Sequence, residues 1–266
     1  MTRRPIHDLH DLAGEAVVLA GGGRALLLQL AHPAVGHGVA DHSDFASRPL
    51  DRLHGTMTYL YAIVFGSPDE VAFVRRMVNR AHGPVRSSPD ARVAYTAFDP
   101  HLQLWVAATL YDSAVTIVEY VFGTLPGETL DRVYREYERV GTALQMPADL
   151  WPADRQAFAR YWSDQLATLR VDATTRSVAH RLLHPTNVPV AIRLAMPLAR
   201  LITTGLLPER LRDEFGLPWG RRRERRFEGV MRLARRVVPS LPDRLRHVAR
   251  DHYGRRLARA IAAATH

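Results

Sequence analysis

The chain has 266 residues, enough for one large domain with a sizeable apolar core. It has no cysteine, which excludes disulfides, iron–sulfur clusters, thiolate metal ligands, cysteine-linked haem and cysteine nucleophiles. All 36 basic residues are arginines, so lysine-dependent phosphate binding and Schiff-base chemistry are excluded as well. Any bound metal therefore needs histidine, aspartate, glutamate or tyrosine ligands.

Apolar residues recur three and four positions apart along most of the chain, while alternating strand-like runs are scarce. This pattern predicts an all-α fold, and the absence of repeats and low-complexity linkers favours a single domain over residues 1–266. Glycine and proline mark the ends of most segments. The predicted helices are 24–31, 50–65, 68–82, 100–122, 129–144, 154–166, 188–204, 208–215, 222–238 and 241–266.

Two segments read as irregular. Residues 36–49 are rich in turn-forming residues, and residues 87–100 form a loop that ends at Asp99-Pro100, a typical helix start. Near the N-terminus, residues 17–20 and three following glycines resemble a strand that enters a dinucleotide-binding turn. Leu26 occupies a position where that motif needs glycine or alanine, and no second strand follows, so a flexible helix junction is favoured over a nucleotide site.

Three histidines, His32, His37 and His42, are spaced by five residues with Asp41 and Asp44 close by. Imidazole and carboxylate ligands together suit zinc or non-haem iron. Five residues advance a helix by about 500°, however, so these side chains do not share a helical face. Solvated or capping roles are the alternative reading.

Arg52 and Thr56 are four residues apart and therefore lie on one face of their predicted helix, with Tyr59 one turn further on. An arginine can hold a cofactor carboxylate, and a threonine hydroxyl can hydrogen-bond to dioxygen. An arginine that extends along the helix surface into solvent is the simpler interpretation of the pattern alone.

His82 ends the predicted helix 68–82 and lies four residues after Val78, on its apolar face. A lone histidine in such a place is commonly a core residue. A neutral imidazole that projects from a helix into an apolar slot is also what a five-coordinate haem requires. The spacing leaves both readings open.

Five sequence blocks, in this order, resemble the MpaB / rubber-oxygenase (latex clearing protein) family, and together they extend over essentially the whole chain. The blocks are LLLQLAHPAVGHGVADHSDF, RLHGTMTYLYAIVFGSPDE, VNRAHGPV, YTAFDPHLQLWVAATLYDS and TGLLPERLRDEFGLPW.

The resemblance implies a globin-like helical core around haem b, with His82 as the proximal iron ligand and Arg52 and Thr56 on the distal side. It implies dioxygen chemistry on an apolar isoprenoid or lipid-like substrate, including oxidative cleavage of an alkene. A haem-binding or apolar-ligand-binding protein without turnover is the alternative. The expected acid–base residues are Asp41, His42 and Asp44, and the expected haem-pocket residues are Met57, Leu60, Val78, Trp105 and Leu110.

The chain departs from the family pattern at two positions. Rubber oxygenases have a lysine three residues after the distal arginine, where it can ligate iron, and this chain has Gly55. That leaves water, His54 or no group at the distal position. Many relatives also have a histidine where this chain has Ala107, so a role there is missing or is taken by His101.

The net charge of +9 is concentrated after Arg221. A solvated arginine-rich helix face is the simplest reading, and peripheral membrane or nucleic-acid contact is a third functional reading. No signal sequence or uncharged run of membrane-spanning length is evident, so we expect a cytoplasmic protein without a specific nucleic-acid partner.

Overall fold

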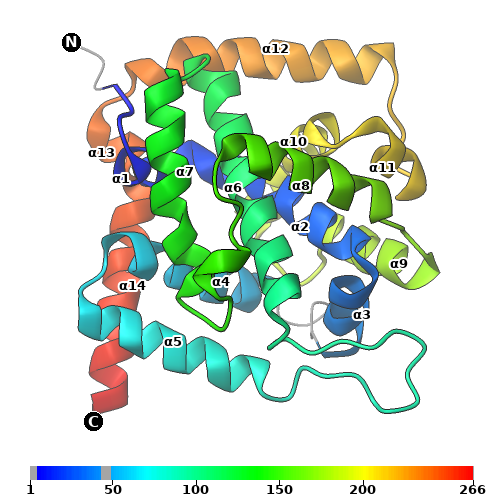
Figure 1. The fold of residues 1–266 in the computed structure, drawn as a ribbon. Helices are drawn as coiled ribbons and strands as arrows, with labels where there is room; N and C mark the ends of the chain where they lie inside the picture. Colours follow the sequence, from blue (N-terminus) through cyan, green and yellow to red (C-terminus); the bar gives the residue numbers. More distant parts are fainter. Residues whose placement is uncertain (1–4, 43–48, 266) are drawn as a thin grey trace.

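The computed structural model describes residues 5–42 and 49–265, with the backbone alone at 49, 50, 52 and 265. Its helices cross one another at varied angles around the long helix α6 (Figure 1). In chain order they are α1 (Leu9–Gly14), the 3₁₀ helix η1 (Ala16–Gly21), α2 (Gly22–Ala31), α3 (Pro33–His42), α4 (Pro49–Phe65), α5 (Pro68–His82), α6 (Pro100–Phe122), α7 (Gly127–Thr142), η2 (Ala148–Leu150), α8 (Arg155–Thr168), α9 (Ala173–Leu183), α10 (Val190–Leu206), α11 (Glu209–Glu214), α12 (Arg221–Val237), η3 (Val238–Ser240), α13 (Asp243–Arg246) and α14 (Val248–Thr265).

The predicted all-α class is confirmed. Within the described ranges no strand occurs, and the only extended pairing is an isolated bridge between Arg86 and Thr96. Most predicted helices are present within a few residues of their expected ends. The clearest case is α6, where the Asp99 side chain accepts hydrogen bonds from the His101 and Leu102 amides and Gly123 ends the helix at φ +90°.

Helix α6 is the central element of the core. Helices η1, α2, α7 and α12 all pack against it, and residues such as Ala108 and Val118 are fully buried. Among the described residues it is the one helix whose length and composition would suit a membrane span, and 56% of the apolar window is buried. This burial is what a core helix of a folded domain shows.

The two largest apolar clusters both include residues of α6. The larger cluster joins α1, α4, α5, α6 and α7, and the smaller one joins α2, α9 and α11 around Trp105. Trp162 of α8 packs against both clusters, so the two halves of the core are continuous. The α4–α5 pair is therefore anchored on the main core.

Two of the irregular segments differ from expectation. The predicted turn-rich region begins with helix α3, which extends to His42, while residues 43–48 lie outside the described part of the chain. Pro33 fits the first turn of this helix because that turn needs no amide donor. Its glycines permit close packing, since a Cβ at Gly36 would lie 2.4 Å from the Leu30 carbonyl oxygen.

The triple glycine lies at the junction of two helices, as predicted, without a strand in the described residues there, and it serves close packing. Helix η1 continues into α2 without a break. A Cβ at Gly21 would lie 2.7 Å from the Ser113 carbonyl oxygen, and one at Gly23 would lie 2.0 Å from the Thr203 hydroxyl. The glycines therefore let both α6 and α10 pack closely against the η1–α2 segment.

Helix α9 was not predicted. Asp172 caps it by accepting a hydrogen bond from the Thr175 amide, and the Thr175 side chain bonds back to the Asp172 amide. This local signal was present in the sequence, but threonines in the first turn obscured the helical pattern.

Candidate functional site

The α4–α5 pair positions the residues of the predicted distal and proximal sides. The two helices have 17 and 15 residues, are joined by two residues and pack together. Ser67 and Glu70 form a capping box that starts α5 directly after the connection. Arg52 lies in the first turn of α4 and His82 is the last residue of α5, so both lie at the end of the pair away from the connection, which we call the open end. Thr56 lies one turn further along α4, near its middle.

His82 is half-buried at the end of α5 and meets Phe98 edge to face, with ring centroids 6.5 Å apart. One turn earlier, Asn79 accepts a hydrogen bond from the Gln145 amide at 2.9 Å. Gln103 of α6 in turn donates to Gln145 Oε1 at 2.7 Å. This chain of amides fixes the last turn of α5 against α6 and so fixes the backbone that carries His82.

The described residues leave open space beside Gly55, the residue before Thr56. Thr56 is half-buried, and a Cβ placed on its neighbour Gly55 would meet no described atom within 4 Å. Leu53 on α4 and Phe98 beside His82 are large apolar side chains that remain 46% and 39% exposed. Sequence reasoning singled out neither, although Phe98 lies in one of the blocks that carry the family resemblance.

His54, one candidate for the vacant lysine position, is directed elsewhere. Its Nδ1 lies 3.1 Å from the Tyr253 hydroxyl of α14. Burial lowers the pKa of His54, and nearby Arg256 and His252 lower it further. His101 is exposed at the start of α6, and Ala107 is buried in the main core.

The five predicted haem-pocket residues do not all meet. Leu60, Val78 and Leu110 pack against the main core. Met57 packs instead with the buried Tyr61 and Tyr253, next to α14. Trp105 belongs to the second cluster, where it is 1% exposed and stacked on Trp162 with centroids 5.3 Å apart.

Asp41 and His42 hold the loop that follows His82. Asp41 Oδ2 accepts a hydrogen bond from the Tyr95 hydroxyl at 2.7 Å, and His42 Nε2 lies 3.0 Å from the Arg86 carbonyl oxygen. Burial and the bond to Asp41 raise the pKa of Tyr95 to about 12, so this hydroxyl remains a donor at neutral pH. Asp44 lies outside the described residues.

The three evenly spaced histidines point to different partners. His37 Nε2 lies 2.7 Å from Asp172, His42 contacts the loop, and His32 packs beside Trp105 with ring centroids 6.4 Å apart. In the described parts of the chain, no group of three histidine, aspartate or glutamate side chains could hold a metal ion.

Two hollows occur on the described part of the chain, and the larger extends along α5 from Asp69 to Arg80. One, of about 580 Å³, lies between α5 and the end of α14, and the other, of about 310 Å³, is an apolar groove between η1, α2, α9 and α10. Neither is lined by Thr56 or His82. The groove is lined by Leu19, Ala20, Gly23, Leu26, Leu27, Leu182, Leu183, Ala195, Met196, Leu198, Ala199, Ile202 and Thr203.

Sequence comparisons place the chain in a known family. Residues 10–236 match the family described as ER-bound oxygenase mpaB/B′/rubber oxygenase, catalytic domain. The chain belongs to this family of oxygenase catalytic domains. It is 39% identical over 222 residues to the uncharacterized proteins Rv2237 of Mycobacterium tuberculosis and Mb2261 of Mycobacterium bovis, which covers 80% of this chain and 87% of each relative. No solved structure matches the chain.

Proposed function

We propose that this protein is a haem b-dependent oxygenase that uses dioxygen on a small apolar substrate, an isoprenoid or lipid-like alkene. The observation that carries the proposal is the family match over residues 10–236, which includes the whole α4–α5 pair. Within that pair, the positions equivalent to the family's distal and proximal residues share one open end.

The residues at this end are compatible with a haem. Gly55 leaves space beside Thr56, and the exposed apolar faces of Leu53 and Phe98 suit a flat apolar group. His82 would be the histidine at the edge of this region, and the partly buried Leu60 and Val78, which pack against the main core, would supply apolar contacts. Met57 and Trp105 pack in other apolar clusters, so we exclude them from the proposed haem pocket.

When bound, a haem would supply the dioxygen-activating chemistry. His82 would hold the iron, and Arg52 would hold a carboxylate of the cofactor or a polar end of the substrate. The Thr56 hydroxyl would donate a hydrogen bond to an oxygen atom on the distal side. Asp41 and His42 would act through position, because they fasten the loop after His82 to α3.

Oxidative cleavage is the reaction we propose. One dioxygen molecule and one carbon–carbon double bond give two carbonyl groups, so atoms and electrons balance without an external reductant. Oxygen uptake should therefore match alkene loss without added reductant.

The first experiment measures haem content by pyridine haemochrome assay in the wild type, His82→Ala and His7→Ala. We expect about one haem per chain in the wild type and in His7→Ala, whose histidine is exposed on the far N-terminal segment, and loss of haem or a shifted Soret band in His82→Ala. If the wild-type protein is purified from cells supplied with haem precursor and still contains no haem, the proposal is contradicted.

Thr56→Val separates catalysis from binding. It should keep the haem and lose at least about tenfold in alkene-dependent oxygen uptake, because the distal hydrogen bond is removed. Haem binding without oxygen uptake on any isoprenoid or lipid alkene would instead identify a binding protein without turnover.

A further inference from the structure

Helix α10 exposes an apolar face for which the described residues provide no cover. Val190, Leu194 and Leu198 follow one another at four-residue intervals and are 59%, 76% and 48% exposed. Residues so spaced lie on one side of a helix. Isolated exposed leucines are ordinary on protein surfaces, but a continuous stripe of this kind marks a contact surface.

The stripe continues into the apolar groove beside it. Ala195 and Leu198 of α10 and the exposed Leu19 of η1 all line that groove, whose volume is about 310 Å³. Pro197 lies within α10, where it removes one helical hydrogen bond. Exposed stripe and groove thus form one apolar surface on α10 and η1, which we call the α10 surface.

The segment that forms most of the α10 surface carries charge of a single sign. Residues 173–208, which contain all of α9 and α10, include four arginines and no aspartate or glutamate. Of these, Arg193 and Arg200 lie on one flank of the α10 stripe, about 100–120° around the helix from Leu194. The arginine-rich helix α12 also packs against α10, at Gly205.

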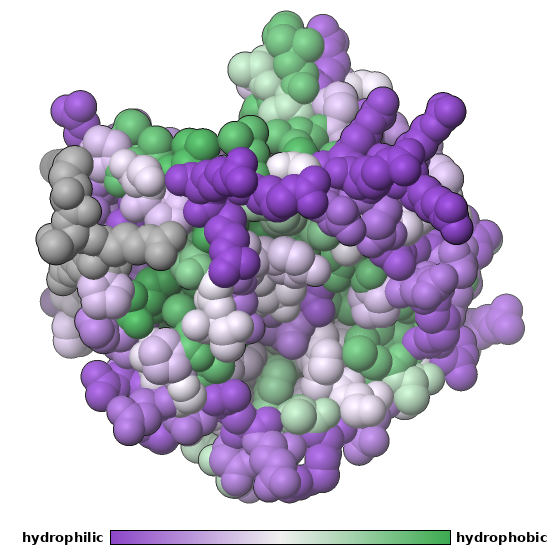
Figure 2. Space-filling view, turned by 90° about the horizontal axis from the view of Figure 1, so that it is seen from above, coloured by the Kyte–Doolittle hydropathy of each residue, from purple (hydrophilic) through white to green (hydrophobic). Residues whose placement is uncertain are grey.

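Apolar and strongly hydrophilic side chains also adjoin one another on the side of the molecule that carries α12 (Figure 2). Figure 2 looks onto the face that carries α12 and shows an apolar lobe projecting beside a band of strongly hydrophilic side chains. An apolar ridge flanked by arginines is the composition of helices that lie in a membrane interface, with the apolar side among the lipid tails and the cations near anionic headgroups.

We propose that the α10 surface docks the protein onto an anionic lipid bilayer. A symmetric contact between two copies through this surface would place the acid-free segments 173–208 against each other, which repulsion between arginines disfavours. An anionic bilayer offers both an apolar phase and the opposite charge. The proposal does not depend on haem or on oxygenase activity.

The test is flotation of the purified full-length protein with vesicles of phosphatidylcholine and phosphatidylglycerol, or of phosphatidylcholine alone. Wild type should float with the phosphatidylglycerol vesicles, much less with phosphatidylcholine, and less as salt rises. Leu194→Glu with Leu198→Glu should weaken binding by about tenfold or more, because two exposed apolar side chains no longer insert.

Leu245→Glu, on α13, is the matched control because Leu245 is also exposed, at 51%, but lies on another element. It should float like the wild type. Circular dichroism and light scattering of each variant check the fold and the oligomeric state. Equal flotation with both lipids, unchanged flotation of the double variant, or a wild-type dimer that the double variant dissociates would each overturn the proposal.

Discussion

His32 lies at the junction of α2 and α3, where its backbone amide caps α2 by donating to the Gln29 carbonyl. Its ring packs beside Trp105, and its Nδ1 is buried without a hydrogen-bond partner among the described residues. Burial lowers the pKa of His32, and the charge of Asp99 opposes this only in part. The neutral imidazole is therefore the form that the fold stabilises.

The pH dependence follows from that shift. The unfolded histidine titrates near 6.5 and the folded one below it, so the unfolded state binds a proton first as the pH falls. The stability that the neutral His32 contributes is fully present above about pH 6.5 and is lost progressively as the pH falls below that value. We expect His32→Gln to reduce the fall in unfolding free energy between about pH 7.5 and pH 5.5.

Urea unfolding at the two pH values measures this difference, with His7→Gln as the control because His7 is exposed. His54, whose pKa is also lowered, contributes in the same direction and remains in both variants. If the unfolding free energy of the wild type and of His32→Gln depends on pH in the same way, burial does not lower the pKa of His32.

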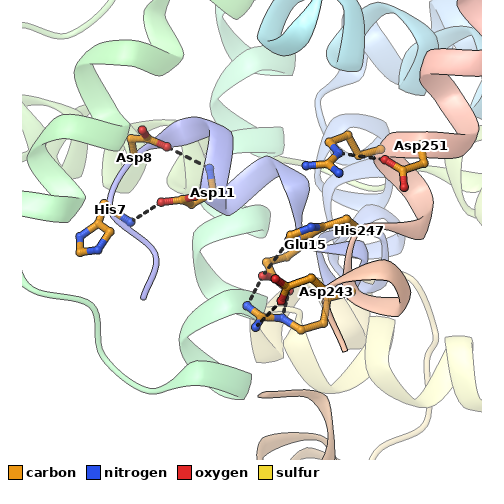
Figure 3. A network of polar contacts seen from close by, with 9 residues as sticks. His7, Asp8, Asp11, Glu15, Asp243, His247 and Asp251 are labelled. Atoms are coloured by element: carbon orange, nitrogen blue, oxygen red, sulfur yellow. Dashed lines mark hydrogen bonds and ion pairs between the residues drawn. The ribbon is translucent and has the colours of Figure 1, made fainter. Parts of the chain in front are cut away.

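At the scale of elements, a buried ion pair joins the N-terminal α1–η1 junction to α13 near the C-terminus. Glu15 precedes η1 and is 2% exposed, and its carboxylate accepts hydrogen bonds from the Arg246 guanidinium of α13, with His247 at 3.8 Å (Figure 3). The guanidinium also lies over the Phe122 ring at the end of α6. The Glu15–Arg246 ion pair joins residues 231 positions apart in the sequence.

Breaking that pair should be costly. Arg246→Met leaves a buried carboxylate without its cation and should lower the unfolding free energy by about 3–5 kcal/mol. Arg250→Met is the control, since the side chains of Arg250 and its partner Asp251 are 41% and 42% exposed and surface pairs contribute about 0–1 kcal/mol. Equal losses for the two variants in chemical denaturation would contradict the buried role of the Glu15 contact.

For the whole molecule, the C-terminal helix completes the support of the candidate site. Helix α14 packs along α4, although it lies beyond the residues that match the family. Tyr253 stacks on Tyr61 with ring centroids 5.3 Å apart and contacts His54, while Leu257 is buried in the main core. The helix that carries Arg52 and Thr56 is thus held from both sides.

Leu257→Ala should lower the unfolding free energy by about 2–5 kcal/mol, because it leaves a cavity between α14 and the core. The amides of α4 should exchange faster with deuterium in this variant. Leu233→Ala removes the same atoms from a side chain that is 63% exposed and should cost no more than about 0.5 kcal/mol. Unchanged exchange along α4 would show that α14 does not support it.

Short-range signals determined much of the fold from sequence. The Asp99-Pro100 start of α6, the Ser67-Pro68 start of α5 and the helical period of α4 were all readable, because caps and periodicity involve residues within one or two turns. The same signals located Thr56 and His82 on their helices. The family resemblance, which the comparisons confirm, then assigned those positions their proposed roles.

Tertiary structure alone decided which face of each helix is covered. Trp105 and Met57 looked equivalent to Leu60 in sequence, but they pack on partners from α8 and α14. The bond between His54 and Tyr253 joins residues 199 positions apart. The apolar stripe of α10 reads like any core helix until the packing leaves it exposed. Periodicity shows that a helix has an apolar side, but its burial depends on elements far away in the chain.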